Sequence, residues 1–194
     1  MSAVMGTMRD KYSFEAAARN LGGGYGIWYT DEDKKIPGEG YAEYLRAIFR
    51  AIEENTEKYG LRKPFLMIEP GRSIVGEAGI TLYTVGAIKD IPGIKKYIAV
   101  DGGMFDNPRY ALYQAKYTAV LANRADEKPT EVVTIAGKCC ESGDIGCSNV
   151  SLAKAKTGDI LAVLYTGAYN DSMASNYNRN AVPRVILVKD GGVD

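Results

Sequence analysis

The sequence predicts an α/β region followed by a mainly antiparallel β domain, and two observations lead to this fold class. Residues 41–71 contain an amphipathic helical pattern and then a short apolar run, which together are typical of βα units of a barrel. From about residue 77 the apolar residues fall instead into short runs separated by turn residues, as in antiparallel sheets. We therefore expect two domains, at residues 1–76 and 77–194.

In the first domain a helix is predicted over about residues 41–59, because apolar side chains recur there at helical spacing and Gly60 follows as a stop signal. Those side chains are Tyr44, Leu45, Ile48, Phe49 and Ile52. Residues 64–69 form a continuous apolar run that Pro70 and Gly71 end, as a buried parallel strand does.

The segments before this helix are predicted from composition. Residues 14–19, Phe-Glu-Ala-Ala-Ala-Arg, have the composition of a helix. Residues 22–40 are rich in glycine and polar residues and include a proline, which predicts a loop. In the second domain the β-rich runs are residues 81–88, 96–100, 131–136, 159–165 and 184–189.

Composition excludes several classes of function. The formal net charge is zero, so no general attraction to nucleic acid or to a membrane surface is expected. The apolar runs are strand-sized, and the first twenty residues lack the continuous apolar core of a secretory signal, so a cytoplasmic location is the default. Three cysteines make a poor disulfide framework and indicate reduced thiols. The chain has no histidine, which excludes Ser-His-Asp, Cys-His and HExxH chemistry.

Five segments concentrate residues suited to chemistry. The glycines of residues 22–26 expose backbone N–H groups that suit a phosphate, although a plain turn is the alternative. Residues 69–72, Glu-Pro-Gly-Arg, follow the predicted strand and offer a carboxylate beside a guanidinium, or else a surface ion pair. Arg109 and Tyr113 lie four apart, hence on one face if the segment is helical, where they could grip a carboxylate or simply pack together.

The last two segments lie after predicted strands. Residues 139–144, Cys-Cys-Glu-Ser-Gly-Asp, hold thiols that can transfer a proton if their neighbours tune them, whereas most buried cysteines are inert. Their spacing does not predict a metal site. Residues 167–178 are dense in hydroxyls and amides, and Tyr169 could bind a phosphate or belong to an ordinary polar loop.

The order and spacing of all five segments resemble the fold-type III pyridoxal-phosphate (PLP) decarboxylases, most closely their diaminopimelate branch. The resemblance covers residues from about 20 to 190. It implies a partial barrel of the alanine-racemase-like type before the β domain, PLP as cofactor and a homodimer with its active site at the interface. It also implies an amino-acid substrate and decarboxylation of meso-diaminopimelate to L-lysine.

By the resemblance, each segment has a role in that reaction. The PLP phosphate is held by the glycine loop, the Glu-Pro-Gly-Arg segment and the later tyrosine, and Glu69 bonds the pyridine nitrogen. Cys140 returns a proton after CO₂ leaves, acting across the dimer interface. The residues so implied are Gly23, Gly24, Glu69, Gly71, Arg72 and Tyr169 for the cofactor, and Arg72, Arg109, Tyr113, Glu141 and Tyr169 for the substrate. Two arginines favour a substrate with two carboxylates over ornithine.

The sequence also departs from the family. No lysine falls in a motif that matches the one anchoring PLP, the stacking histidine is missing, and Tyr110 replaces the usual proline. The isolated chain is therefore expected to show little or no decarboxylation. Alternatives are a non-catalytic homologue that pairs with a full-length decarboxylase, and a related amino-acid or polyamine decarboxylase.

Overall fold

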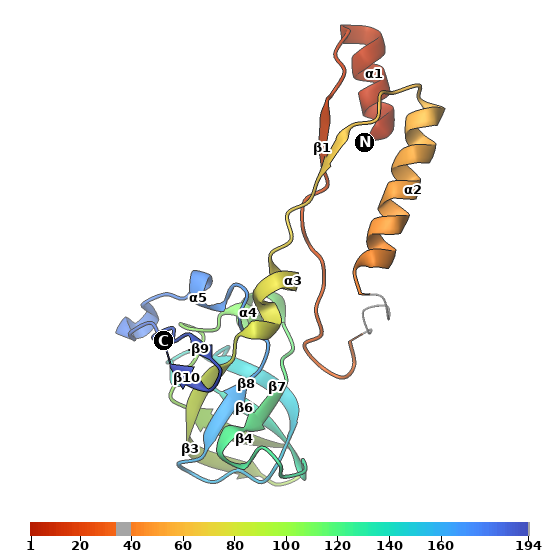
Figure 1. The fold of residues 1–194 in the computed structure, drawn as a ribbon. Helices are drawn as coiled ribbons and strands as arrows, with labels where there is room; N and C mark the ends of the chain where they lie inside the picture. Colours follow the sequence, from red (N-terminus) through yellow and green to blue (C-terminus); the bar gives the residue numbers. More distant parts are fainter. Residues whose placement is uncertain (34–39, 194) are drawn as a thin grey trace. The chain divides into compact units, whose positions relative to one another are not determined.

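The computed structural model describes residues 1–33 and 40–193, which form two compact units (Figure 1). Unit 1 comprises residues 1–28 and 40–71, and unit 2 comprises residues 29–33 and 72–193. The main division falls between Gly71 and Arg72, a few residues before the boundary near residue 77 that the sequence predicts. Residues 34–39 of the predicted loop lie outside the described residues.

Unit 1 contains two helices and a pair of short parallel strands. The helices are α1 (Ser2–Tyr12) and α2 (Ala42–Lys58), and the strands are β1 (Ala18–Asn20) and β2 (Phe65–Met67). The helix predicted at residues 14–19 is wrong, because this segment leads into β1. Ser13 adopts a left-handed conformation that ends α1, and the N–H of Phe65 donates to the carbonyl of Ala17 over 2.8 Å. Strand pairing thus overrides the helix propensity of the alanines.

Helix α2 and strand β2 confirm the elements predicted at residues 41–59 and 64–69, with shorter ends. The helix ends at Lys58, two residues before Gly60, whose φ of +58° suits glycine. Its apolar stripe is only partly covered: Ile52 is buried, whereas Phe49 is 50% exposed. Two parallel strands do not make the barrel of the resemblance, and among residues 1–33 and 40–193 the alanine-racemase-like barrel half is not found. A barrel needs a closed ring of strands, and unit 1 supplies one pair.

The described part of unit 2 is a β domain with three short α-helices and three 3-10 helices of one turn each, at Gly76–Ala78, Ala122–Arg124 and Tyr177–Arg179. The strands of its main sheet are β3 (Thr81–Ile91), β4 (Lys95–Val100), β5 (Ala119–Leu121), β6 (Glu131–Ala136), β7 (Ile145–Leu152) and β8 (Ile160–Val163). The helices are α3 (Arg72–Val75), α4 (Arg109–Tyr113) and α5 (Asn170–Met173), and a separate hairpin joins β9 (Val188–Lys189) to β10 (Gly192–Val193).

The main sheet has the order β5-β8-β3-β4-β6-β7 and is nearly closed. Its pairings are antiparallel except for β4 with β6, so the predicted mainly antiparallel domain is confirmed with one parallel pairing. Strand β3 takes part in two pairings: residues 81–84 pair with β8, and residues 85–91 pair with β4, with a bulge between Val85 and Ile88. A bulge of this kind bends a strand and lets it serve two parts of a sheet.

The inward side chains of this sheet form the core of unit 2. The largest fully buried ones are Ile98, Leu121, Ile135, Leu152 and Leu161. Strands β5 and β7 of this sheet were not predicted from the sequence. Of the strand predicted at residues 184–189, only the two residues of β9 are a strand in the structure. Within the described parts of the chain, no helix has the length and apolar character to cross a bilayer.

Candidate functional site

The glycine loop and Glu69 lie side by side in unit 1, because β1 and β2 are parallel and end at the same edge. The N–H of Glu69 donates to the carbonyl of Gly22 over 2.8 Å. A Cβ at Gly23 would stand 2.3 Å from the carbonyl oxygen of Glu69, so only glycine permits this approach. Two segments separated by more than forty residues of sequence therefore share one strand end, where ligand sites in α/β folds gather.

Asn20, which the sequence analysis missed, joins these two segments. Its side-chain amide donates to a carboxylate oxygen of Glu69 over 2.6 Å, and its own oxygen accepts the N–H of Gly22 over 2.8 Å. This local bond to the residue two further on is a turn signal of asparagine that the sequence could have revealed. The amide thus orients the Glu69 carboxylate.

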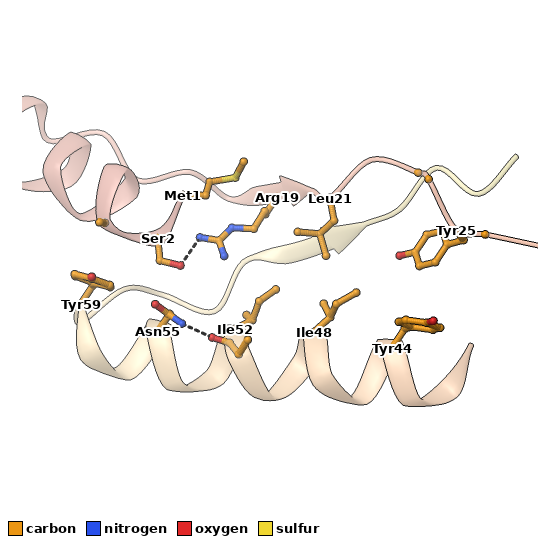
Figure 2. Close-up of a pocket in the computed structure, with 15 residues that line it drawn as sticks. Met1, Ser2, Arg19, Leu21, Tyr25, Tyr44, Ile48, Ile52, Asn55 and Tyr59 are labelled. Carbon is orange, nitrogen blue, oxygen red and sulfur yellow. Dashed lines mark hydrogen bonds between the residues drawn. The ribbon is translucent and has the colours of Figure 1, made fainter. Parts of the chain in front are cut away.

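The same loop borders an open groove of about 770 Å³ within unit 1. In Figure 2, Tyr44, Ile48 and Ile52 of α2 point across this groove toward Leu21 and Tyr25. Gly23, Gly24 and Gly26 line it too, without side chains over their backbone. Because the groove is open, the apolar side chains of α2 that line it are only partly covered.

In unit 2, Arg72 and Arg109 gather around the ring of Tyr169. The guanidinium carbons of the two arginines lie 5.5 and 5.6 Å from the Tyr169 ring centroid. Arg72 begins α3, Arg109 begins α4, and Tyr169 directly precedes α5, so three short helices converge here. The structure thus brings together three residues that the sequence analysis assigned to phosphate and substrate.

Close backbone packing explains how α3 reaches Tyr169. The N–H of Gly167 donates to the carbonyl of Gly76 over 3.1 Å, and a Cβ at Gly167 would stand 1.9 Å from the carbonyl oxygen of Val75. Tyr169 itself has a φ of +73°, an unfavourable conformation for a residue with a side chain. The Gly-Ala-Tyr turn is therefore held against α3 by a contact that requires glycine.

Two further tyrosines, missed in the sequence analysis, hold Arg109. Its Nη1 donates to the hydroxyl of Tyr29 over 3.0 Å and to that of Tyr117 over 2.8 Å. The two rings meet edge to face with centroids 5.3 Å apart, and the Tyr117 hydroxyl donates to Asn170 over 3.3 Å. Burial raises the pKa of Tyr117, against the opposing effect of Arg109, so the phenol keeps its proton at neutral pH.

The charges of these arginines are not neutralised by nearby carboxylates. Among residues 1–33 and 40–193, neither Arg72 nor Arg109 forms an ion pair, although Arg109 is only 6% exposed. The Nε atoms of both, and the side-chain nitrogen of Asn170, are buried without a hydrogen-bond partner. A buried guanidinium group such as that of Arg109 normally acquires an anion, so this cluster fits a phosphate or a carboxylate.

The Cys-Cys-Glu-Ser-Gly-Asp loop is organised by its last residue. The Asp144 carboxylate accepts the N–H of Met104 over 2.6 Å and that of Cys139 over 2.7 Å. A Cβ at Gly137 would stand 2.3 Å from this carboxylate, so a side chain there would displace it. Cys140 is exposed, and its N–H donates to Asn178 over 3.2 Å, which links the loop to the segment of Tyr169.

Two predicted site residues do not join these clusters. Tyr113 shares the helix α4 with Arg109, as predicted, but it is 64% exposed while Arg109 is buried. The Glu141 carboxylate accepts the N–H of Gly143 over 3.2 Å within its own loop. Gly71 ends unit 1, next to Arg72.

A comparison with known protein families identifies the family of this chain. Residues 11–167 match the family model described as pyridoxal-dependent decarboxylase, C-terminal sheet domain. The chain belongs to this decarboxylase family. The nearly closed sheet of unit 2 is thus the sheet domain of a pyridoxal-dependent decarboxylase, which confirms the family resemblance of the five segments.

Individual relatives agree with this assignment. The chain is 54% identical over 183 residues to diaminopimelate decarboxylase of Bacillus subtilis, covering 94% of this chain and 41% of the relative. It is 48% identical over 180 residues to the Synechocystis enzyme of the same name, covering 93% and 38%. The chain therefore spans about two-fifths of the length of these curated relatives.

Solved structures are similar in fold. Diaminopimelate decarboxylase from M. jannaschii, in complex with L-lysine, matches with a TM-score of 0.84 and 38% identity over 98% of this chain and 42% of that one. The Helicobacter pylori enzyme, also with L-lysine, matches with a TM-score of 0.79 and 27% identity over 100% and 45%.

Proposed function

We propose that this chain supplies the sheet domain and part of the cofactor site of a PLP-dependent decarboxylase that converts meso-diaminopimelate to L-lysine. The observation that carries the proposal is the pair of arginines around Tyr169, both without a neutralising carboxylate among the described residues. A phosphate and a substrate carboxylate are the anions that such a reaction brings to one site. The relatives named diaminopimelate decarboxylase support this choice of substrate.

The residues present fit PLP, since Arg72 has an unpartnered buried Nε and Gly23 and Gly24 leave backbone N–H groups accessible. In the proposal Gly23, Gly24, Gly71, Arg72 and Tyr169 hold the phosphate. When bound, PLP supplies an electron sink, because its protonated ring withdraws the electron pair released as CO₂ departs. Glu69, oriented by Asn20, keeps a proton on the ring nitrogen by placing a negative charge beside it.

The remaining roles concern the substrate. Arg109, held by Tyr29 and Tyr117, binds the distal carboxylate together with Arg72, while Glu141 and Tyr113 contact the rest of the amino acid. Cys140 donates a proton to the carbon that loses CO₂, and its exposure permits that contact. We place the protein in the cytoplasm, as a homodimer in which Cys140 acts across the interface.

A chimera tests the catalytic proposal. The matched 183-residue segment of the Bacillus subtilis enzyme is replaced by the corresponding part of this chain, and lysine formation from meso-diaminopimelate is measured. The chimera is expected to bind PLP and to form lysine, and Cys140→Ala is expected to lower kcat by roughly 10²–10⁴-fold. Cys139→Ala is the matched control. A folded, PLP-loaded chimera that forms no lysine contradicts the proposal.

Substrate choice and the dimer have separate tests. In the same chimera, Arg109→Gln is expected to raise KM for meso-diaminopimelate, whereas Arg124→Gln, which removes a guanidinium paired with Asp159, is the control. A chimera that prefers ornithine contradicts diacid recognition.

Mixing a Cys140→Ala chimera with one lacking the barrel lysine restores activity if Cys140 acts across an interface. The isolated chain is expected to form little or no lysine with added PLP.

A further inference from the structure

Two adjacent thiols, Cys139 and Cys140, lie on a surface loop of unit 2. Cys140 is exposed and Cys139 is partly exposed, whereas the third cysteine, Cys147, is buried in β7 and 1% exposed. Burial raises the pKa of Cys147 to about 12, so this thiol is both inaccessible and protonated. The proposed decarboxylation uses only one of the two surface thiols.

Hydrogen bonds fix both residues of this Cys-Cys pair. The N–H of Cys139 donates to Asp144 over 2.7 Å and that of Cys140 to Asn178 over 3.2 Å. The side-chain amide of Asn180 also donates to the Cys139 sulfur over 3.7 Å. The chain bends at residues 138–140 instead of continuing β6, so the two side chains are freed from the strict alternation of a strand. The dipeptide is therefore a preorganised feature of the loop.

The spacing of the two residues determines what they can bind. Consecutive Cα atoms joined by a trans peptide are about 3.8 Å apart, whereas unstrained disulfides span roughly 4.4–6.8 Å. The chain has no cis peptide bond among its described residues. A direct disulfide is therefore disfavoured, but a third atom inserted between the sulfurs relieves this restriction. Thiolates select soft ions, and two thiolates suit an atom that accepts two sulfur ligands.

We propose that Cys139 and Cys140 form a bidentate site for trivalent arsenic, a soft element that takes two adjacent thiols. With an arsenical of the type R–As=O, two As–S bonds form, the As–O bond breaks, and the oxygen leaves as water with both thiol protons. No electron is transferred, so no oxidant is required. Among the described residues no three cysteine, acidic or histidine side chains cluster for a metal, which distinguishes this site from an ordinary metal centre.

The site shares Cys140 with the proposed decarboxylation, so arsenic bound there would remove the proposed proton donor. The proposed decarboxylation also requires an accessible Cys140 thiol, and a thiol that contacts an amino-acid substrate can be reached by a small arsenical. Exposure of Cys140 supports the same access in the chain itself.

Phenylarsine oxide is the probe. The 194-residue chain, kept reduced, is titrated with it and followed by intact-mass spectrometry and by the number of thiols that still react with a disulfide reagent. We expect one equivalent to bind, two reactive thiols to disappear, and the adduct to survive excess monothiol but to be released by a dithiol.

Substitutions distinguish the pair from a single reactive cysteine. Cys139→Ser and Cys140→Ser are each expected to lower affinity by roughly 10²-fold, because a second linkage to an already tethered ligand acts at high effective concentration. Cys147→Ser is expected to bind like the wild type, and circular dichroism verifies that each variant is folded. The proposal is overturned if the native chain binds no arsenical, or if either surface serine variant keeps an adduct that resists monothiol.

Discussion

The two units of this chain bury their apolar side chains to very different extents. Unit 2 closes a six-stranded sheet around fully buried side chains such as Ile98 and Leu161. Unit 1 leaves Phe65 of β2 71% exposed, and the apolar stripe of α2 faces an open groove (Figure 2). Parallel strands are normally covered on both faces, and unit 1 covers few of its apolar side chains. The difference indicates that unit 2 carries the stability of the chain.

The largest expected effect is in the core of unit 2. Leu161→Ala removes a fully buried side chain from β8 and should destabilise unit 2 by roughly 2–5 kcal/mol, through lost burial and the cavity left behind. Urea denaturation followed by circular dichroism measures the change. A shift below about 1 kcal/mol would show that the sheet repacks easily and would weaken the contrast between the units.

Gly167→Ala tests the close approach behind the Tyr169 turn. The added Cβ would stand 1.9 Å from the Val75 carbonyl oxygen, so backbone must move, at a cost of roughly 1–3 kcal/mol. Gly146→Ala is the matched control, because its Cβ would meet atoms only at 3.9 Å. Thermal unfolding of both variants gives the comparison, and equal midpoints would contradict it.

Tyr117→Phe removes one hydroxyl from the arginine cluster of unit 2. The buried Arg109 and Asn170 each lose a hydrogen-bond partner, which should destabilise by roughly 1–3 kcal/mol. Tyr113→Phe alters an exposed tyrosine and should change the unfolding free energy by less than about 0.5 kcal/mol. Similar denaturation midpoints for the two variants would mean that the cluster adds nothing to stability.

Asp159 gives a smaller, pH-dependent effect. Hydrogen bonds from Asn123, then from Arg124 and the N–H of Lys156, lower the pKa of this carboxyl to about 2, although burial opposes them. Because the folded-state pKa is depressed, the stabilisation is present above the unfolded value near 3.8 and is lost as pH falls toward 2. Solvent screening limits it to about 1 kcal/mol. Denaturation from pH 5 to 2 should show a shallower loss in Asp159→Asn, and parallel curves would contradict the assignment.

The smallest effect is expected in unit 1. Phe65→Thr changes an exposed side chain on a short strand, so the transition of unit 2 should move by less than about 0.5 kcal/mol. Self-association should decrease, because exposed apolar surface promotes aggregation. Light scattering and urea denaturation test both points, and a large loss of stability would mean that Phe65 is covered in solution.

Much of the fold was predictable where local pattern and burial agree. Helix α2 and strands β3, β4 and β6 follow the apolar periodicity of the sequence. Strands β5 and β7 did not follow from it, because β5 has three residues and β7 carries glycine, serine and asparagine among its apolar residues. The helix wrongly predicted at residues 14–19 has good helical composition, but its end pairs with β2. Contacts distant in sequence decided these elements.

The sequence by itself determined the family, through five short segments in a fixed order, and it placed Arg72, Arg109 and Tyr169 among the candidates. Only the tertiary structure decided that these three side chains meet, and that Tyr29 and Tyr117 hold Arg109 in place. The physical reason is that a sequence motif indicates which chemistry a residue can perform, but not which side chains lie next to it in space. Which side chains meet in space depends on how the nearly closed sheet brings distant loops together.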